Sequence, residues 1–170
     1  MFYSYELYVP CIWQCFATYL LLRRGISVLF QDVDMVWFKT PFPYFHDYLR
    51  KYADSFNETG SHIEAFFSDD GQRSLRYTPF YANSGFYYLL ANPRSEYFAW
   101  SIMIAFDSIQ RLGSHQNVVT ARLLEEMSLT HRHVKILPMD DFPNGILYHH
   151  NPAYMKKMRA KTVDPYMFHM

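Results

Sequence analysis

An apolar segment near the first quarter of the chain ends in two closely spaced carboxylates. Residues 26–30 are almost entirely apolar, and Asp32 and Asp34 follow directly. This pattern predicts a buried strand with the acid pair at or just past its carboxyl end. Open α/β sheets bind ligands in the crevice outside such strand ends. The segment therefore favours an α/β fold with a ligand site at one edge of its sheet.

The surroundings of the acid pair suggest a metal site. Ionised carboxylates beside apolar residues such as Val36 and Trp37 are costly unless a cation or strong donors neutralise them. A pair that offers only oxygen ligands suits Mg²⁺ or Mn²⁺. The alternative, a polar turn whose acids face water, stays open because short acidic turns are common.

Composition narrows the class of protein. The 170 residues suit one domain, and 50% hydrophobic with 19% charged residues indicates a globular chain. Sixteen basic and sixteen acidic side chains cancel, which gives no electrostatic case for nucleic acid or an anionic membrane as partner. Apolar runs fall short of the roughly 18 residues of a membrane span, so none is expected here. Cys11 and Cys15 are four apart on one predicted helix, where a disulfide is not expected.

Helical and strand patterns alternate along the chain, which predicts a mixed α/β sheet flanked by helices. Pro10 is expected near the start of the first helix and Gly25 at its end. Residues 44–62 suggest a helix or loop that carries the sequon Asn57-Glu58-Thr59. The remaining predicted elements are strands at 27–30, 35–38, 63–67, 80–90 and 134–137, and helices at 97–112 and 116–127.

Two further polar groups interrupt this pattern. Asn83-Ser84-Gly85 lies inside an apolar run, where the glycine permits close approach of a ligand, although a β-bulge explains it equally well. His115-Gln116-Asn117 begins a predicted helix, where free backbone N–H groups can meet ligand oxygens. By itself the second group is ordinary helix-start chemistry.

The eight histidines give little support for zinc. The two close histidine pairs lack cysteine partners and the i, i+4 helical spacing of many zinc sites. Another histidine, His169, lies in an apolar tail one residue from the end. The two pairs are His131 with His133 and His149 with His150.

Taken together, these motifs resemble the nucleotide-diphospho-sugar transferase domain of plant and algal cell-wall arabinosyl-, xylosyl- and galactosyltransferases. The first block is the most specific, because its acid pair is followed by Trp37 and then by two prolines. The order of the blocks is that of the family and covers nearly the whole chain. The blocks are Val28-Leu-Phe-Gln-Asp32-Val-Asp34-Met-Val-Trp37, Pro41-Phe-Pro43, Asn83-Ser-Gly-Phe86, Gln116-Asn117, Leu137-Pro138, Phe142-Pro-Asn-Gly145 and Phe168-His169.

The resemblance implies a GT-A fold, a Rossmann-related mixed sheet, that transfers a sugar with retention of anomeric configuration. The donor would be a nucleotide-sugar, usually UDP-linked, and the acceptor a glycan or glycoprotein. Mn²⁺ (or Mg²⁺) would be the cofactor, and the Golgi lumen of the secretory pathway the location.

Site roles follow from the same resemblance. Asp32 would contact the ribose or donor sugar as well as the metal, with Asp34 and His169 as further metal ligands. Asn83 and Gly85 would line the donor-sugar pocket. Gln116 would be the catalytic residue near the β face of the sugar, in a pattern whose flanking acids are here replaced by His115 and Asn117.

The amino end departs from the family pattern. Residues 1–8 precede the first predicted helix, which is too short for the strand and turn that hold the nucleotide base. We therefore expect residues 1–170 to form a single partial domain, truncated at its amino end and lacking the first nucleotide-binding strand.

Two other hypotheses account for the acid pair. A haloacid-dehalogenase-like phosphatase would use Asp32 as nucleophile and Asp34 as acid/base, with Asp140 and Asp141 completing a Mg²⁺ site. A non-catalytic remnant of a transferase would bind sugar weakly and transfer nothing.

Overall fold

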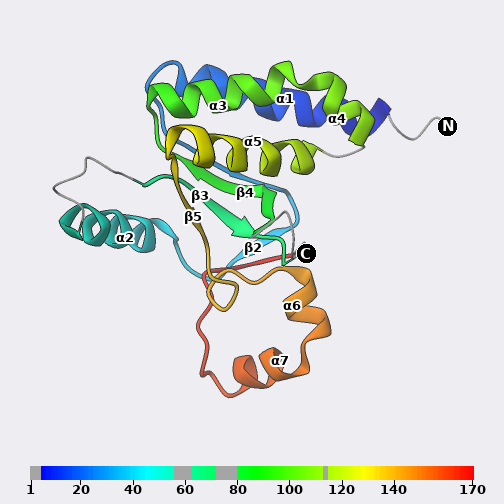
Figure 1. The fold of residues 1–170 in the computed structure, drawn as a ribbon. Helices are drawn as coiled ribbons and strands as arrows, with labels where there is room; N and C mark the ends of the chain where they lie inside the picture. Colours follow the sequence, from blue (N-terminus) through cyan, green and yellow to red (C-terminus); the bar gives the residue numbers. More distant parts are fainter. Residues whose placement is uncertain (1–4, 56–62, 72–79, 113–114) are drawn as a thin grey trace.

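The computed structural model describes residues 5–55, 63–71, 80–112 and 115–170. A sheet lies at the centre, with a layer of helices on one side and a smaller lobe that carries α6 and α7 on the other (Figure 1). The expectation of a mixed α/β sheet flanked by helices is confirmed. The predicted sequon at 57–59 lies outside the described residues.

The main sheet has the strand order β1-β4-β3-β5. β4 is antiparallel to both β1 and β3, whereas β3 and β5 are parallel. Consequently β1, β3 and β5 all end at the same edge of the sheet, where β4 begins. The four strands are β1 (Val28–Gln31), β3 (Ile63–Asp69), β4 (Ala82–Leu89) and β5 (His133–Ile136).

A second, two-stranded sheet joins distant parts of the chain. β2 (Met35–Trp37) follows the acid pair closely, and β6 (Met167–His169) lies at the end of the chain. The strands pair antiparallel, with Met35 opposite His169. This pairing places the last strand beside the turn that carries Asp32 and Asp34.

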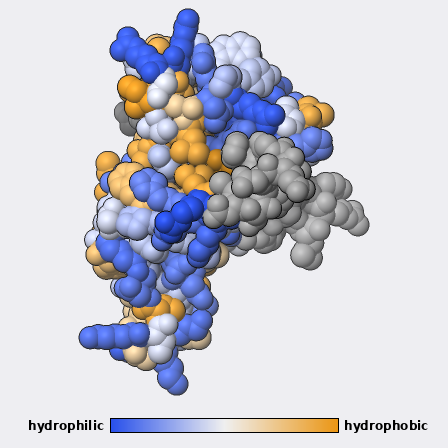
Figure 2. Space-filling view, turned by 90° about the vertical axis from the view of Figure 1, so that its left-hand side faces the viewer, coloured by the Kyte–Doolittle hydropathy of each residue, from blue (hydrophilic) through white to orange (hydrophobic). Residues whose placement is uncertain are grey.

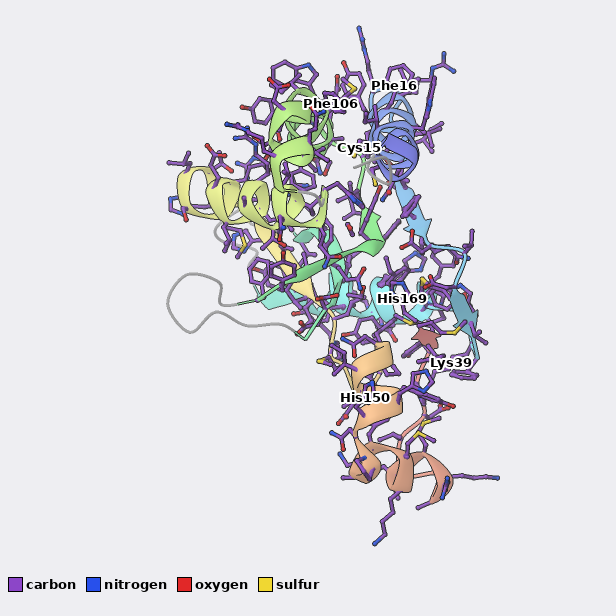
Figure 3. The ribbon with its side chains drawn as sticks, turned by 90° about the vertical axis from the view of Figure 1, so that its right-hand side faces the viewer. Cys15, Phe16, Lys39, Phe106, His150 and His169 are labelled. Atoms are coloured by element: carbon purple, nitrogen blue, oxygen red, sulfur yellow. The ribbon has the colours of Figure 1, made fainter. Side chains whose placement is uncertain are left out.

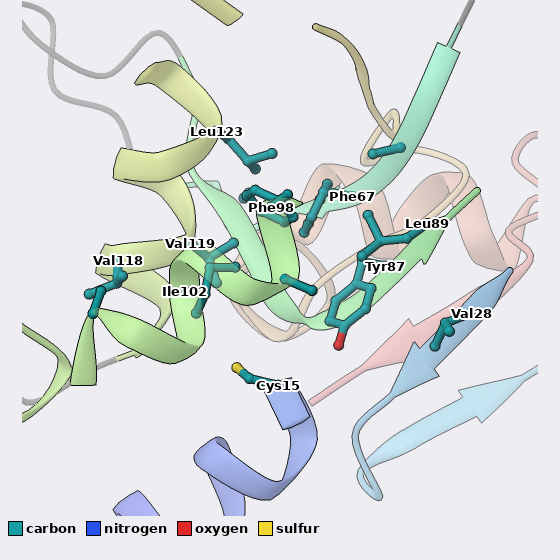
Figure 4. Close-up of a cluster of buried hydrophobic side chains, with 14 of the residues drawn as sticks. Cys15, Val28, Phe67, Tyr87, Leu89, Phe98, Ile102, Val118, Val119 and Leu123 are labelled. Carbon is teal, nitrogen blue, oxygen red and sulfur yellow. The ribbon is translucent and has the colours of Figure 1, made fainter. Parts of the chain in front are cut away.

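Four helices pack on one face of the main sheet. A buried cluster joins Cys15 of α1, Tyr87 and Leu89 of β4, and Phe98 of α3, with further contributions from α5 (Figure 4). Because these elements share one apolar core, the start of α5 is held close to β4. The helices are α1 (Tyr5–Leu22), α3 (Pro93–Ile104), α4 (Phe106–Leu112) and α5 (His115–Thr130).

The other face carries an aromatic core. Phe45 of α2 (Phe42–Ser55) packs 4.8 Å from Phe66 and 5.0 Å from Tyr88, measured between ring centroids. Phe86 and Phe142 join the same buried cluster. α6 (Gly145–His150) and α7 (Pro152–Arg159) follow this core, and the lobe that they form is largely hydrophilic in Figure 2.

Two predicted helix boundaries are wrong. The first helix begins at Tyr5 rather than near Pro10, so the proline lies inside it, where its missing N–H disfavours a helix. The predicted helix 97–112 is two helices, α3 and α4, that meet at Ala105. α3 also begins earlier, at Pro93, because the Asn92 side chain accepts a hydrogen bond from the Ser95 amide at 2.8 Å.

Two further observations concern the cysteines and the helices. Cys11 and Cys15 form no disulfide. Among the described residues, no helix has the length and apolar character required to cross a membrane.

Candidate functional site

The acid pair lies in the turn directly after β1. The amide of Asp32 donates to the carbonyl of Gly85 at 2.7 Å, which extends the β1–β4 ladder by one residue. Val33, between the two acids, is fully exposed. The side chains of Asp32 and Asp34 are 48% and 42% exposed. The pair is thus half-buried, unlike a turn whose acids simply face water.

His169 reaches the acid pair from the end of the chain. Its ring is 7% exposed, and Nε2 lies 3.3 Å from Oδ1 of Asp34 and 3.9 Å from Oδ2 of Asp32. Pairing of β6 with β2 fixes this position, and the His169 amide also donates to the carbonyl of Pro143 at 3.2 Å. Figure 3 shows His169 between the main sheet and the α6–α7 lobe.

Asp32, Asp34 and His169 offer one ligand atom each, and the three atoms lie within 4.8 Å of one another. Oδ1 of Asp34 is buried and accepts no hydrogen bond from any described residue. A buried carboxylate oxygen without a donor is costly, and a cation would remove that cost. The two carboxylates and the imidazole therefore fit a divalent metal ion.

Burial shapes the electrostatics of this group. It raises the pKa of Asp32 above its ordinary value, and the nearby charge of Asp34 raises it further, while His169 and His115 oppose the shift. Burial also lowers the pKa of His115, whose Nε2 has no hydrogen-bond partner within the described part of the chain. A cation among these groups would favour the charged form of Asp32.

Because Gly85 has no side chain, the side chains of Asp32 and His169 can lie directly beside it. An added Cβ would lie 2.7 Å from Cε1 of His169 and 2.9 Å from Cγ of Asp32, with Oδ2 of Asp32 closer still. Residues 84–86 bulge out of the pairing between β3 and β4. The bulge, one of the two alternatives that the sequence left open, is therefore present, and close approach of a ligand to Gly85 stays a prediction.

A hydrogen-bond network joins Gly85 to two other predicted site residues. Oδ1 of Asn83 accepts from the Gly85 amide at 2.7 Å. Oε1 of Gln116, at the start of α5, accepts from both the amide and the hydroxyl of Ser84, at 3.1 and 3.3 Å. Both amide side chains thus use their oxygens to hold the bulge. Their predicted roles toward a sugar stay predictions.

Two residues of this edge were not recognised as site residues from the sequence. Asp70, read as part of a turn, directs Oδ1 toward Nδ2 of Asn83 at 3.3 Å. Burial raises its pKa, and a hydrogen bond from Gln116 partly offsets that shift. Asn144, which directly precedes α6, donates to the carbonyls of Asp69 and Asp70 and so joins the end of β3 to the start of α6. The available signal for Asp70 was an acid placed after a buried strand, as with Asp32.

Other polar residues considered from the sequence do not join the acid pair. Within the described ranges, the close group of potential metal ligands is the triad of Asp32, Asp34 and His169. Asp140, which the phosphatase hypothesis places in the metal site, instead lies 3.6 Å from Lys157. His150 lies on α6, apart from His169 (Figure 3). The zinc and phosphatase arrangements therefore lack support from the described geometry.

Comparison with known proteins gives one match. A family model described as nucleotide-diphospho-sugar transferase matches residues 17–170. No curated protein and no solved structure matches the chain. The matched range contains β1, both acids, the Ser84–Gly85 bulge and the final histidine.

Proposed function

Because the chain belongs to the nucleotide-diphospho-sugar transferase family, we propose that it moves a glycosyl group from a nucleotide-sugar donor to a glycan or glycoprotein acceptor. The donor would be UDP-linked, the transfer retaining and the location the Golgi lumen. These three details rest on the sequence resemblance alone. The family match also favours transfer over the phosphatase hypothesis.

One observation carries the proposal: the triad of Asp32, Asp34 and His169 beside Gly85. Mn²⁺ (or Mg²⁺) would be held by these three side chains, and such an ion neutralises negative charge on a diphosphate leaving group. The unsatisfied Oδ1 of Asp34 supports a cation at this point. The missing side chain of Gly85 leaves room beside the ligands.

The neighbouring polar groups suit the sugar end of such a donor. Asn83, Ser84 and Gln116 belong to one hydrogen-bond network on β4 and α5, next to the triad. Gln116 is proposed as the residue nearest the reacting carbon, and Asn83 with Gly85 as part of the donor-sugar pocket. Polar groups that are already held by hydrogen bonds can orient a substrate without reorganising.

Calorimetric titration of the chain with UDP, with and without Mn²⁺, tests the proposal. We expect binding that requires Mn²⁺ and is abolished by EDTA. Asp34→Ala should weaken it at least tenfold, since it removes a direct ligand. Asp140→Asn is the matched control, because this exposed acid lies outside the triad and should leave binding unchanged.

Three outcomes distinguish the hypotheses. Mn²⁺-dependent UDP binding that is lost in Asp34→Ala supports the transferase site. An intact, folded chain that binds no UDP under any metal condition supports the remnant. Hydrolysis of an aryl phosphate that requires Asp140 would restore the phosphatase hypothesis.

A further inference from the structure

Asp70 extends from the carboxyl end of β3 into the edge of the sheet that carries the triad. Its backbone is fixed on both sides: the amide donates to the carbonyl of Tyr81 at 2.9 Å, and the carbonyl accepts from Asn144 at 2.7 Å. Its side chain meets Asn83 at 3.3 Å and lies close enough to His169 to interact electrostatically. The carboxylate is therefore a positioned part of this edge.

The oxygens of the two neighbouring amides already accept hydrogen bonds within the protein. Oε1 of Gln116 already accepts two, from the amide and hydroxyl of Ser84. Oδ1 of Asn83 accepts one from the Gly85 amide. A carboxylate has about four acceptor positions, and the two amide side chains occupy two of those on Asp70. Asp70 thus retains about two free acceptor positions, whereas Oε1 of Gln116 has none left and Oδ1 of Asn83 has about one.

The other acids at this edge have different partners. Asp32 and Asp34 belong to the triad itself, where they would bind the cation. Asp69 is buried, and its Oδ1 accepts from the Gly71 amide at 2.9 Å. Among the described acids at this edge, Asp70 is the one that is half-buried and directed at the network of Asn83 and Gln116.

We propose that Asp70 accepts a hydrogen bond from a hydroxyl of the donor's glycosyl group and so helps to select the sugar. The inference rests on the proposed function, because it assigns a contact within that same site. A carboxylate only accepts, so it favours a sugar with a hydroxyl at the facing ring position over one that lacks it. A hydrogen bond to a charged group is also stronger than a neutral one.

A structural role is the competing explanation, since Asp70 also orients two amides. Asp70→Asn distinguishes the structural role from sugar binding, because asparagine keeps the shape of the side chain and one acceptor oxygen but removes the charge. Affinities for UDP and for UDP-sugars are measured by calorimetry with Mn²⁺ on the whole chain. The panel contains UDP-galactose, UDP-xylose, UDP-arabinopyranose and UDP-glucose. Asp107→Asn, an exposed acid on α4, is the matched control.

We expect the affinity of Asp70→Asn for UDP to stay within about twofold of the parent chain. Its affinity for the preferred UDP-sugar, relative to UDP, should fall on the order of tenfold or more. Equal losses for UDP and UDP-sugar, or no loss for either, overturn the proposal. Asp107→Asn should match the parent for both.

A second measurement uses the parent chain and does not depend on the folding of a variant. Mono-deoxy analogues of the preferred UDP-sugar are titrated, and one of them should bind on the order of tenfold more weakly. That analogue should show no additional loss with Asp70→Asn, since both changes remove one interaction. If every analogue binds like the parent sugar, the inference is wrong even though UDP binds. If UDP itself does not bind, the proposed function fails first.

Discussion

Gly85→Ala tests how closely the site is packed. To reach an ordinary contact of 3.4 Å from the added Cβ, Cγ of Asp32 would have to retreat by about 0.5 Å and Cε1 of His169 by about 0.7 Å. Oδ2 of Asp32 lies closest to that Cβ and would have to move further than either. His169 is buried and fixed in β6, so most of the movement falls on the half-exposed Asp32. Metal sites tolerate ligand displacements of only about 0.2 Å. The variant should therefore bind Mn²⁺ about 10- to 100-fold more weakly.

The cost to folding should be smaller than the loss of metal binding. The backbone of Gly85 lies outside the left-handed region, so alanine adds crowding without backbone strain. Crowding of this kind costs about 1–3 kcal/mol, which a domain of this size tolerates. Calorimetric Mn²⁺ titration measures the affinity, and urea unfolding measures the free energy of unfolding of the same variant.

Gly25→Ala is the control for the glycine change itself. Gly25 has φ +74° and nothing within 4 Å of an added Cβ, so alanine there costs about 1–2 kcal/mol through the backbone alone. Its Mn²⁺ affinity should equal that of the parent chain. A folded Gly85→Ala chain with unchanged Mn²⁺ affinity would refute the argument that this glycine makes room for the ligands.

Three other predictions concern stability and reactivity. Arg132→Met should lower the free energy of unfolding, measured by urea denaturation, by about 3–5 kcal/mol. The reason is that Glu126, 2.7 Å from the buried guanidinium, loses its partner. A loss below about 1 kcal/mol would contradict this prediction. Phe45→Ala should cost about 3–5 kcal/mol, since this fully buried ring holds α2 against the sheet, whereas the conservative Phe45→Leu should cost clearly less. Burial raises the pKa of Cys15 from 9.0 to about 12. At pH 8 the thiolate fraction of Cys15 is therefore about 1000-fold lower in the folded chain than in the chain unfolded in urea. Iodoacetamide labelling followed by mass spectrometry should show a correspondingly slower reaction of the folded chain. The same shift makes folding stability fall as pH rises from about 9 to about 12, and equal labelling rates in the two states would be inconsistent with the burial of this thiol.

Local patterns were sufficient for much of the fold. The apolar run before the acid pair, the helical spacing of residues 115–130 and the alternation of elements each depend on near neighbours. The boundaries of α3 and α4 were missed because a break at Ala105 leaves no proline or glycine in the sequence. The interrupted run around Gly85 was recognised, but its bulge could not be separated from a ligand-binding role by sequence alone.

The sequence by itself determined the chemistry available to the site. Asp32 and Asp34 directly follow an apolar strand segment, so two carboxylates stand at the carboxyl end of that strand whatever surrounds them. The family match over residues 17–170 likewise depends on sequence order.

Tertiary structure decided which groups meet. His169 follows Asp34 by about 135 residues, and only the pairing of β6 with β2 brings its ring to the acids. Asp70 joins the edge because β1 and β3 run in the same direction on either side of β4. Strand order and pairing depend on contacts between distant segments, and such contacts have no signature in the spacing of neighbouring residues.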